Sequence, residues 1–160
     1  MKRIKKTLVF GVGNEILTDD GIGPKLVNQL KNDINPDNIN FETAFVGGLE
    51  ILDFIQGYET AIFIDAIKTK NGTAGDIYEF ELSDFKETLH LSNLHDISFL
   101  TAIEMGKRID YDIPKTIKII AIEIVEDMIY SDNFSPKIEQ KYEDIYKEVS
   151  DYVKQYAQSS

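Results

Sequence analysis

The chain has 160 residues, of which 42% are hydrophobic and 28% are charged, and its formal net charge is −11. This length and apolar content are typical of one globular domain, so we predict a single domain over residues 1–160. The negative charge argues against binding to nucleic acid, because a phosphate backbone requires a cationic surface. The sequence has no cysteine, which excludes a disulfide framework, a thiolate zinc site and a cysteine nucleophile.

The first apolar run limits the choice of cellular location. It follows the basic residues MKRIKK and extends only from Thr7 to Val12, which is too short for the core of a signal peptide. No later segment approaches the roughly 20 apolar residues of a membrane span. We therefore expect a cytoplasmic protein that does not engage a membrane.

The amino-terminal third of the chain alternates between strand and helix patterns. Residues 7–12 (TLVFGV) are continuously apolar, as expected of a strand that is buried on both faces. A helix is predicted next, with Pro24 in its first turn and turn-forming residues over 32–38 at its end. Residues 41–46 are then predicted to form a second strand and residues 48–55 a short helix.

The rest of the chain continues this alternation. Residues 61–67 (AIFIDAI) are a second apolar run, and residues 76–82 (DIYEFEL) alternate as a half-exposed edge strand does. Residues 97–109 are predicted to form a helix and residues 117–124 a late strand. A long amphipathic helix is predicted to begin at Ser135.

The predicted order β-α-β-α-β-β-α-β-α indicates a three-layer α/β fold. Parallel strands need crossover connections, so the prediction is a twisted, mainly parallel sheet of about five strands with helices on both faces. Such sheets bind ligands beyond the carboxyl ends of their strands, where the winding direction switches. Because the first and third strands are commonly adjacent, polar residues that follow these two strands are the first candidates for a site.

The loop after the first strand, GVGNEILTDDG (residues 11–21), begins with two of the glycines of a dinucleotide-binding fingerprint. The position of the third glycine is held by Ile16, and no lysine stands at the spacing of a phosphate-binding loop. We therefore expect no nucleotide cofactor.

With a nucleotide site excluded, the acidic residues that follow the first and third predicted strands are the candidate reactive groups. Asp19 and Asp20 precede a helix, where either carboxylate can act as a cap while its neighbour points elsewhere. Asp65 interrupts an apolar strand, and a buried carboxylate needs hydrogen bonds, a partner or a metal. We predict that Asp20 and Asp65 face one crevice, although a structural role for each stays open.

The chain has two histidines, and both precede the third predicted helix. His95, in the polar stretch LSNLHDIS, is predicted to approach the two carboxylates from a third loop at the same edge of the sheet. His90, in the amphipathic stretch ETLHLS, is interpreted as structural. Two carboxylates and one imidazole form an oxygen and nitrogen site that suits a borderline divalent metal such as nickel or zinc.

Three segments together resemble the hydrogenase maturation protease family. They are GVGNEILTDDGIGP (residues 11–24), IFIDAI (residues 62–67) and SNLHDISFLTA (residues 92–102). The pattern G-x-G-N-x-[IL]-x-x-D-[DE]-G-x-G is far more specific than a bare G-x-G. The resemblance implies a five-stranded twisted sheet between helices, which agrees with the fold derived from hydrophobic patterning.

The resemblance also implies the roles of particular residues. It implies that Asp20, Asp65 and His95 bind nickel at the active site, with Asp20 at a position where relatives often carry Glu. It further implies that the substrate is the precursor of a nickel-iron hydrogenase large subunit, that this precursor supplies the nickel, and that a C-terminal peptide is removed. Residues 95–109 are most similar to the archaeal branch that acts on the deazaflavin-reducing hydrogenase.

Two mechanisms are compatible with these residues. In the first, Asp20 or Asp65 activates a water molecule for peptide hydrolysis, in an aspartic-type or metal-assisted reaction. In the second, the residues only position the nickel and the precursor. A non-catalytic nickel-binding chaperone is the alternative function. We expect a monomer, because the alternation over residues 76–82 is typical of a protected sheet edge.

Overall fold

The computed structural model describes residues 7–45, 49–85, 88–91 and 99–158. Its strands are β1 Thr7–Val12, β2 Ile39–Ala44, β3 Thr60–Ile67, β4 Ile77–Glu81 and β5 Thr116–Glu123, its α-helices are α1 Ile22–Asp33, α2 Glu50–Ile55, α3 Phe99–Arg108 and α4 Pro136–Gln158, and its short 3-10 helices are η1 Thr18–Gly21 and η2 Leu82–Asp84. The predicted order of the main elements is confirmed. Residues 46, 48, 97 and 98, which the predictions also covered, lie outside the described residues.

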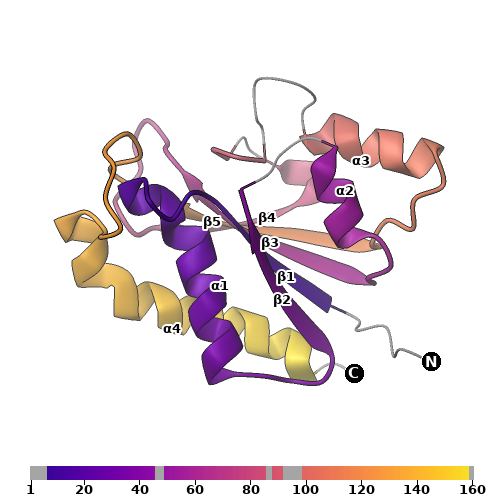
Figure 1. Cartoon of the computed structure of the whole chain (residues 1–160), viewed down its shortest axis with the longest axis horizontal. Coiled ribbons are helices and arrows are strands. Elements are labelled where there is room, and N and C mark those ends of the chain that lie inside the picture. Colours follow the sequence, from indigo (N-terminus) through magenta and orange to yellow (C-terminus); the bar gives the residue numbers. More distant parts are fainter. Residues whose placement is uncertain (1–6, 46–48, 86–87, 92–98, 159–160) are drawn as a thin grey trace.

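The five strands form one sheet in the order β2-β1-β3-β5-β4. β1 pairs in parallel with β2 and β3, and β3 pairs in parallel with β5, whereas β4 is antiparallel to β5. The winding direction therefore switches between β1 and β3, as predicted (Figure 1). β4 lies at an edge of the sheet, which confirms the interpretation of its alternating sequence.

Helices cover both faces of the sheet and enclose two hydrophobic cores. α1 and α4 lie on one side and α2 and α3 on the other (Figure 1). Along β1, Val9 belongs to the core under α1 and α4, whereas Leu8 and Phe10 belong to the core under α2 and α3. Because successive residues of a strand point to opposite faces, a strand buried on both faces must be apolar throughout.

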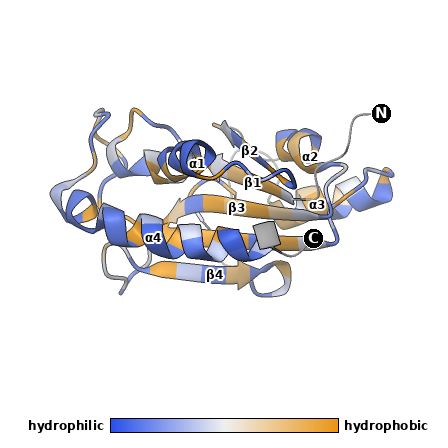
Figure 2. Ribbon diagram, turned by 90° about the horizontal axis from the view of Figure 1, so that it is seen from below, coloured by the Kyte–Doolittle hydropathy of each residue, from blue (hydrophilic) through white to orange (hydrophobic). Residues whose placement is uncertain are grey.

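α4 is amphipathic along its whole length. Ile138, Ile145 and Val149 point into the core, while Glu139 and Glu143 are exposed. The ribbon of this helix accordingly alternates between hydrophobic and hydrophilic colours in Figure 2. Most of its stability must come from this buried stripe, because helices are held mainly by tertiary packing. No helix within the described ranges has the length and apolar character needed to cross a membrane.

The start of α1 lies unusually close to the sheet. A Cβ atom added at Gly23 would lie 2.4 Å from the Ile64 carbonyl oxygen and 2.9 Å from that of Val12. Only glycine allows this approach, because any larger residue would force the helix away from the strands. The contact holds the turn that precedes α1 against the carboxyl ends of β1 and β3, where the predicted site lies.

Candidate functional site

Three chain segments meet at the carboxyl edge of the sheet. Asp20 lies in η1, which follows the loop after β1. Asp65 lies in β3, one residue beyond the last β1–β3 pair, Gly11 with Ile64. The third segment, residues 88–91, is fixed beside β3 by a hydrogen bond of 3.0 Å from the Leu89 N–H to the Ala66 carbonyl, and it carries His90.

The His90 ring lies between the two carboxylates. Its Nδ1 atom is 2.5 Å from Oδ1 of Asp65, and its Nε2 atom is 3.0 Å from Oδ1 and 3.1 Å from Oδ2 of Asp20. Asp20 and Asp65 therefore converge on one imidazole ring, as expected of two acids that the sequence places at the same edge of the sheet. The group that joins them is the histidine that sequence reasoning had interpreted as structural.

Asp65 is fully buried and is surrounded by hydrogen-bond donors. Its Oδ1 accepts the Ala66 N–H at 2.8 Å, and its Oδ2 accepts the N–H groups of His90 at 3.0 Å and Leu91 at 3.3 Å. Backbone donors stabilise a buried carboxylate in its charged form. Asp65 therefore holds the segment that presents His90, as the structural alternative expected, and its functional role stays a prediction.

Asp20 is slightly less buried than Asp65. It is 4% exposed, and besides the imidazole it accepts one backbone bond, from the Asn14 N–H to Oδ2 at 2.9 Å. Gly13 makes room for this loop, because a Cβ atom there would lie 2.2 Å from the Asp20 carbonyl oxygen. Asp20 is thus held from the first loop while its carboxylate faces the imidazole.

The two acids keep His90 charged at neutral pH. Burial works to lower the pKa of the ring, but the hydrogen bonds to Asp20 and Asp65 and the charges of these acids outweigh it and raise the pKa to about 10. The ring is then an imidazolium that donates both N–H groups. Two carboxylates and one imidazolium leave a net charge of −1, so this group of side chains favours cations.

His95 lies outside the described residues, and its predicted role at the site stays a prediction. Both histidines precede the third predicted helix in the sequence, so their positions along the chain could not distinguish them. No sequence pattern singles out His90, because residues 89–91 form a turn and a turn has no period that fixes where its side chains point.

Asp19 has a different role from its neighbour. Its buried carboxylate accepts the N–H groups of Val125 at 3.1 Å, Glu126 at 2.9 Å and Ser135 at 2.7 Å, and the Ser135 hydroxyl at 2.7 Å. The aspartate thus ties η1 to the loop between β5 and α4. Neither aspartate caps α1, which has Gly21 at its N-cap and no side-chain cap bond.

Glu123 is another buried acid near this edge, and its contacts are structural. It is 2% exposed and binds Thr69 through the backbone N–H and the hydroxyl, as well as the Tyr78 hydroxyl. These donors satisfy both carboxylate oxygens and fix the loop after β3. Glu123 is therefore not a candidate for catalysis.

The carboxylates of Asp20 and Asp65 can bind a cation, but two side chains are too few to hold a metal ion. No group of three or more His, Cys, Asp or Glu side chains in the described part of the chain is arranged to hold a metal ion. Asp20 and Asp65 supply two carboxylates that already contact one ring, that of His90. A borderline divalent metal would need a further donor, which nitrogen from an imidazole can supply.

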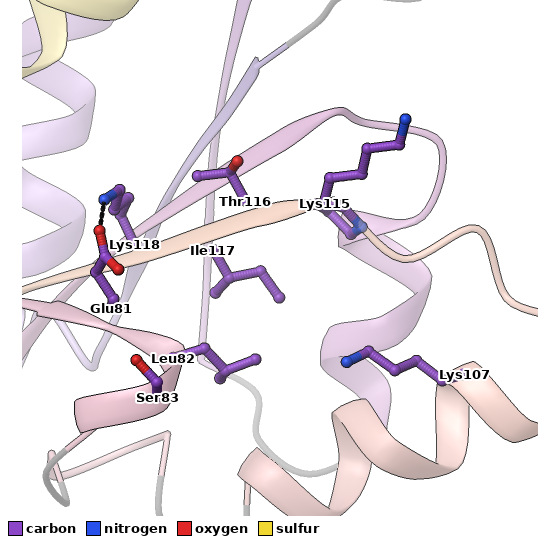
Figure 3. A pocket seen from close by; sticks show the side chains of 9 residues that line it. Glu81, Leu82, Ser83, Lys107, Lys115, Thr116, Ile117 and Lys118 are labelled. Atoms are coloured by element: carbon purple, nitrogen blue, oxygen red, sulfur yellow. Dashed lines mark hydrogen bonds and ion pairs between the residues drawn. The ribbon is translucent and has the colours of Figure 1, made fainter.

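A second hollow, of about 380 Å³, lies at the opposite edge of the sheet (Figure 3). It includes Thr116, which pairs with Thr60 at the start of β3, whereas Asp65 lies near the end of that strand. Lys107 and Lys118 line it, and Lys118 is already paired with Glu81. The hollow lacks the convergent acids of the carboxyl edge and lies away from the switch point of the sheet.

The fold and the site define a class of protein. The chain is a three-layer α/β protein with a buried acid pair at the carboxyl edge of its sheet, next to the point where the winding direction changes. Proteins of this architecture commonly place their reactive groups there. The class alone does not fix the chemistry.

Comparisons with known proteins identify the family. Residues 24–152 match the sequence model described as "Hydrogenase maturation protease". The chain belongs to the hydrogenase maturation protease family. The matched region includes Asp65 and both histidines, while Asp20 precedes it.

Individual relatives agree with this assignment. The hydrogenase 2 maturation protease of Escherichia coli K12 is 35% identical over 71 residues, which are 44% of this chain and 43% of that protein. The structure of the hydrogenase maturating endopeptidase HybD from E. coli has a TM-score of 0.74 at 22% identity, and the superposition covers 94% of this chain and 93% of the HybD chain. The structure of the hydrogenase 2 maturation peptidase of a Thaumarchaeota archaeon has a TM-score of 0.65 at 24% identity, and the superposition covers 98% of this chain and 100% of the archaeal chain.

Proposed function

We propose that the protein is an endopeptidase that removes the C-terminal extension of a nickel-loaded hydrogenase large-subunit precursor. The observation that carries the proposal is the convergence of Asp20 and Asp65 on the His90 ring at the carboxyl edge of the sheet. Membership in the hydrogenase maturation protease family supports the peptidase class and the precursor as partner. The proposal has the protein act in the cytoplasm as a monomer and without a nucleotide.

In this proposal the nickel belongs to the substrate. The precursor presents its metal to Asp20 and Asp65, and His95 supplies an imidazole nitrogen, because both ring nitrogens of His90 already contact the two carboxylates. Because both carboxylates already bind the His90 imidazolium, docking requires that ring to move out of the space between them. The protease would thus distinguish a loaded precursor, which brings a cation able to replace the imidazolium, from an empty one.

Hydrolysis needs a base beside the scissile bond, and we assign this role to Asp20. Asp65 is fully buried and accepts three backbone N–H groups, whereas Asp20 accepts one and is 4% exposed. The Asp20 carboxylate would take a proton from water as the water oxygen attacks the carbonyl carbon. Cleavage of the C–N bond then returns that proton to the leaving amine nitrogen. The bound metal would polarise the water or the carbonyl oxygen.

The test is mass spectrometry of a nickel-loaded precursor before and after exposure to the protein and to Asp20→Ala, Asp65→Ala and His95→Ala. The proposal expects loss of a C-terminal peptide with the unaltered protein and little or no loss with the three variants. Variants with a circular dichroism spectrum like that of the unaltered protein are the ones compared. A stable complex with nickel-loaded precursor and no mass change would contradict the proposal and would instead favour a nickel-binding chaperone.

A further inference from the structure

The outer edge of β2 carries unpaired main-chain groups. The Thr7 N–H bonds to the Asn38 carbonyl at 3.1 Å and the Gly13 N–H to the Ala44 carbonyl at 3.2 Å, which fixes the even-numbered residues of β2 as those that face β1. In a parallel ladder the alternate residues direct their N–H and C=O groups away. The main chains of Phe41 and Thr43 therefore point outward, and neither has a partner there within the described residues.

β2 and β4 lie at opposite margins of the sheet (Figure 2). At one margin, β4 runs antiparallel to its neighbour and continues into η2. At the other margin, β2 has one exposed charged residue, Glu42. An open strand edge is a template for another extended chain unless charges, proline or a covering element blunt it. The described part of β2 has few such protections.

A cavity of about 310 Å³ lies at the carboxyl end of this edge. It is lined by residues 43–45, by residues 13–16 and by Pro24. Two of its apolar side chains are unusually exposed, Ile16 at 55% and Phe45 at 63%. A cavity of this volume accommodates a large apolar side chain, and exposed apolar surface beside a site is typical of a binding surface.

The cavity is joined to the acid pair by two contacts. The Phe45 ring packs edge to face against the His90 ring, with 5.7 Å between the ring centroids. On the other side, Asn14 lines the cavity and donates its N–H to Asp20. A chain that follows β2 toward its carboxyl end therefore arrives at the carboxylates.

The charges around the edge define the chemistry of the occupant. Glu15, which lines the cavity, and Glu42, in the middle of β2, are exposed, and the whole chain has a net charge of −11. A peptide with lysine or arginine beside its extended segment is the complementary partner. Only an extended polypeptide offers the alternating donors and acceptors that Phe41 and Thr43 require.

We propose that the edge of β2 and its cavity bind the C-terminal segment of the precursor as an added strand, with an apolar side chain in the cavity and basic residues near Glu15 and Glu42. This inference rests on the proposed function, because it assigns the surface to that substrate. It adds the route by which the peptide reaches Asp20. Main-chain bonds to β2 supply affinity, and the cavity and the two glutamates supply selectivity.

The test measures peptide binding without relying on cleavage. The probe is a capped heptapeptide, Lys-Thr-Val-Thr-Val-Thr-Lys, titrated into the whole protein and followed by NMR of backbone amides. We expect the Phe41 and Thr43 amides to shift and to exchange with solvent more slowly. Two control peptides are titrated in the same way, one with Glu in place of both Lys and one with methylated main-chain nitrogens. The affinity of each should be lower than that of the probe by a factor of about ten or more.

Thr43→Pro tests the same bonds from the protein side. It removes the outward N–H but no bond of the sheet, so affinity for the probe should fall about tenfold, whereas Thr43→Val, which keeps that N–H, should stay within about twofold. Unchanged Phe41 and Thr43 amides at saturating probe, or equal binding of the methylated peptide, would overturn the docking surface even if Thr43→Pro fails to fold. A protein that binds the probe but leaves nickel-loaded precursor intact would instead overturn the proposed function and leave the docking surface standing.

Discussion

Asp19 and Asp20 are adjacent, lie in the same short helical turn and are both almost fully buried, yet their surroundings differ completely. Asp19 accepts hydrogen bonds from three backbone N–H groups and a serine hydroxyl of the loop before α4. Asp20 accepts one backbone bond and otherwise faces an imidazolium. Backbone donors cannot leave without local unfolding, whereas a side chain can rotate away. The comparison separates a carboxylate that holds the fold from one that can exchange its partner.

Asp20→Asn should have the largest effect, and this effect is on cleavage. Removing the charge of the proposed base should lower kcat for a nickel-loaded precursor by about 10³-fold, since general bases contribute on the order of 10²–10⁴. The free energy of unfolding should fall only by the share of the His90 ion pair that Asp20 supplies, because Asn retains an oxygen for the Asn14 N–H. Cleavage at the original rate would show that Asp20 is not the base. Rate measurements and urea unfolding of the same preparation provide both values.

Asp19→Ala should have the converse effect. It leaves the N–H groups of Val125, Glu126 and Ser135 without their acceptor, so we expect the free energy of unfolding to fall by about 3–5 kcal/mol. Urea unfolding at neutral pH measures this loss. Asp19→Asn is the matched control and should lose less, because one oxygen remains. A loss below about 1 kcal/mol for Asp19→Ala would remove the distinction between the two aspartates.

The central strands and the buried acid of β3 could be predicted from the sequence, whereas the partners of the site side chains could not. Two continuous apolar runs identified β1 and β3, and the cost of burying Asp65 inside the second run marked it as a residue with partners. The different partners of Asp19 and Asp20 could not be predicted, because they depend on a loop more than 100 residues away in the chain. The pattern likewise gave no way to place His90, because a short polar stretch has no period that fixes where its side chains point.

The pH dependence of stability tests the imidazolium. The pKa of His90 is raised to about 10 in the folded protein from its usual 6.5. The stabilisation is therefore fully present below pH 6.5 and is lost as the pH rises through 10. Between pH 7 and 10 we expect a loss of roughly 2–3 kcal/mol relative to His90→Gln, measured by urea unfolding at each pH. Parallel curves for the two proteins would contradict a charged ring.

Ser135→Ala should have the smallest effect. It removes the hydroxyl donor to Asp19 and leaves the Ser135 backbone N–H in place, so we expect a loss of about 1 kcal/mol in the free energy of unfolding. Cleavage should be unchanged, because the Asp20 side of the turn is not altered. Thermal unfolding and the cleavage assay check these two expectations. A loss of cleavage with full stability would mean that the loop before α4 acts on the site directly.

The central claim is that Asp20 and Asp65 recognise a cation brought by the substrate, and the most direct measurement compares nickel-loaded with nickel-free precursor. Each form is incubated with the protein under identical conditions, and the mass of the large subunit is followed over time. The account predicts loss of the C-terminal peptide from the loaded form and an unchanged mass for the nickel-free form. Cleavage of both forms at the same rate would contradict it.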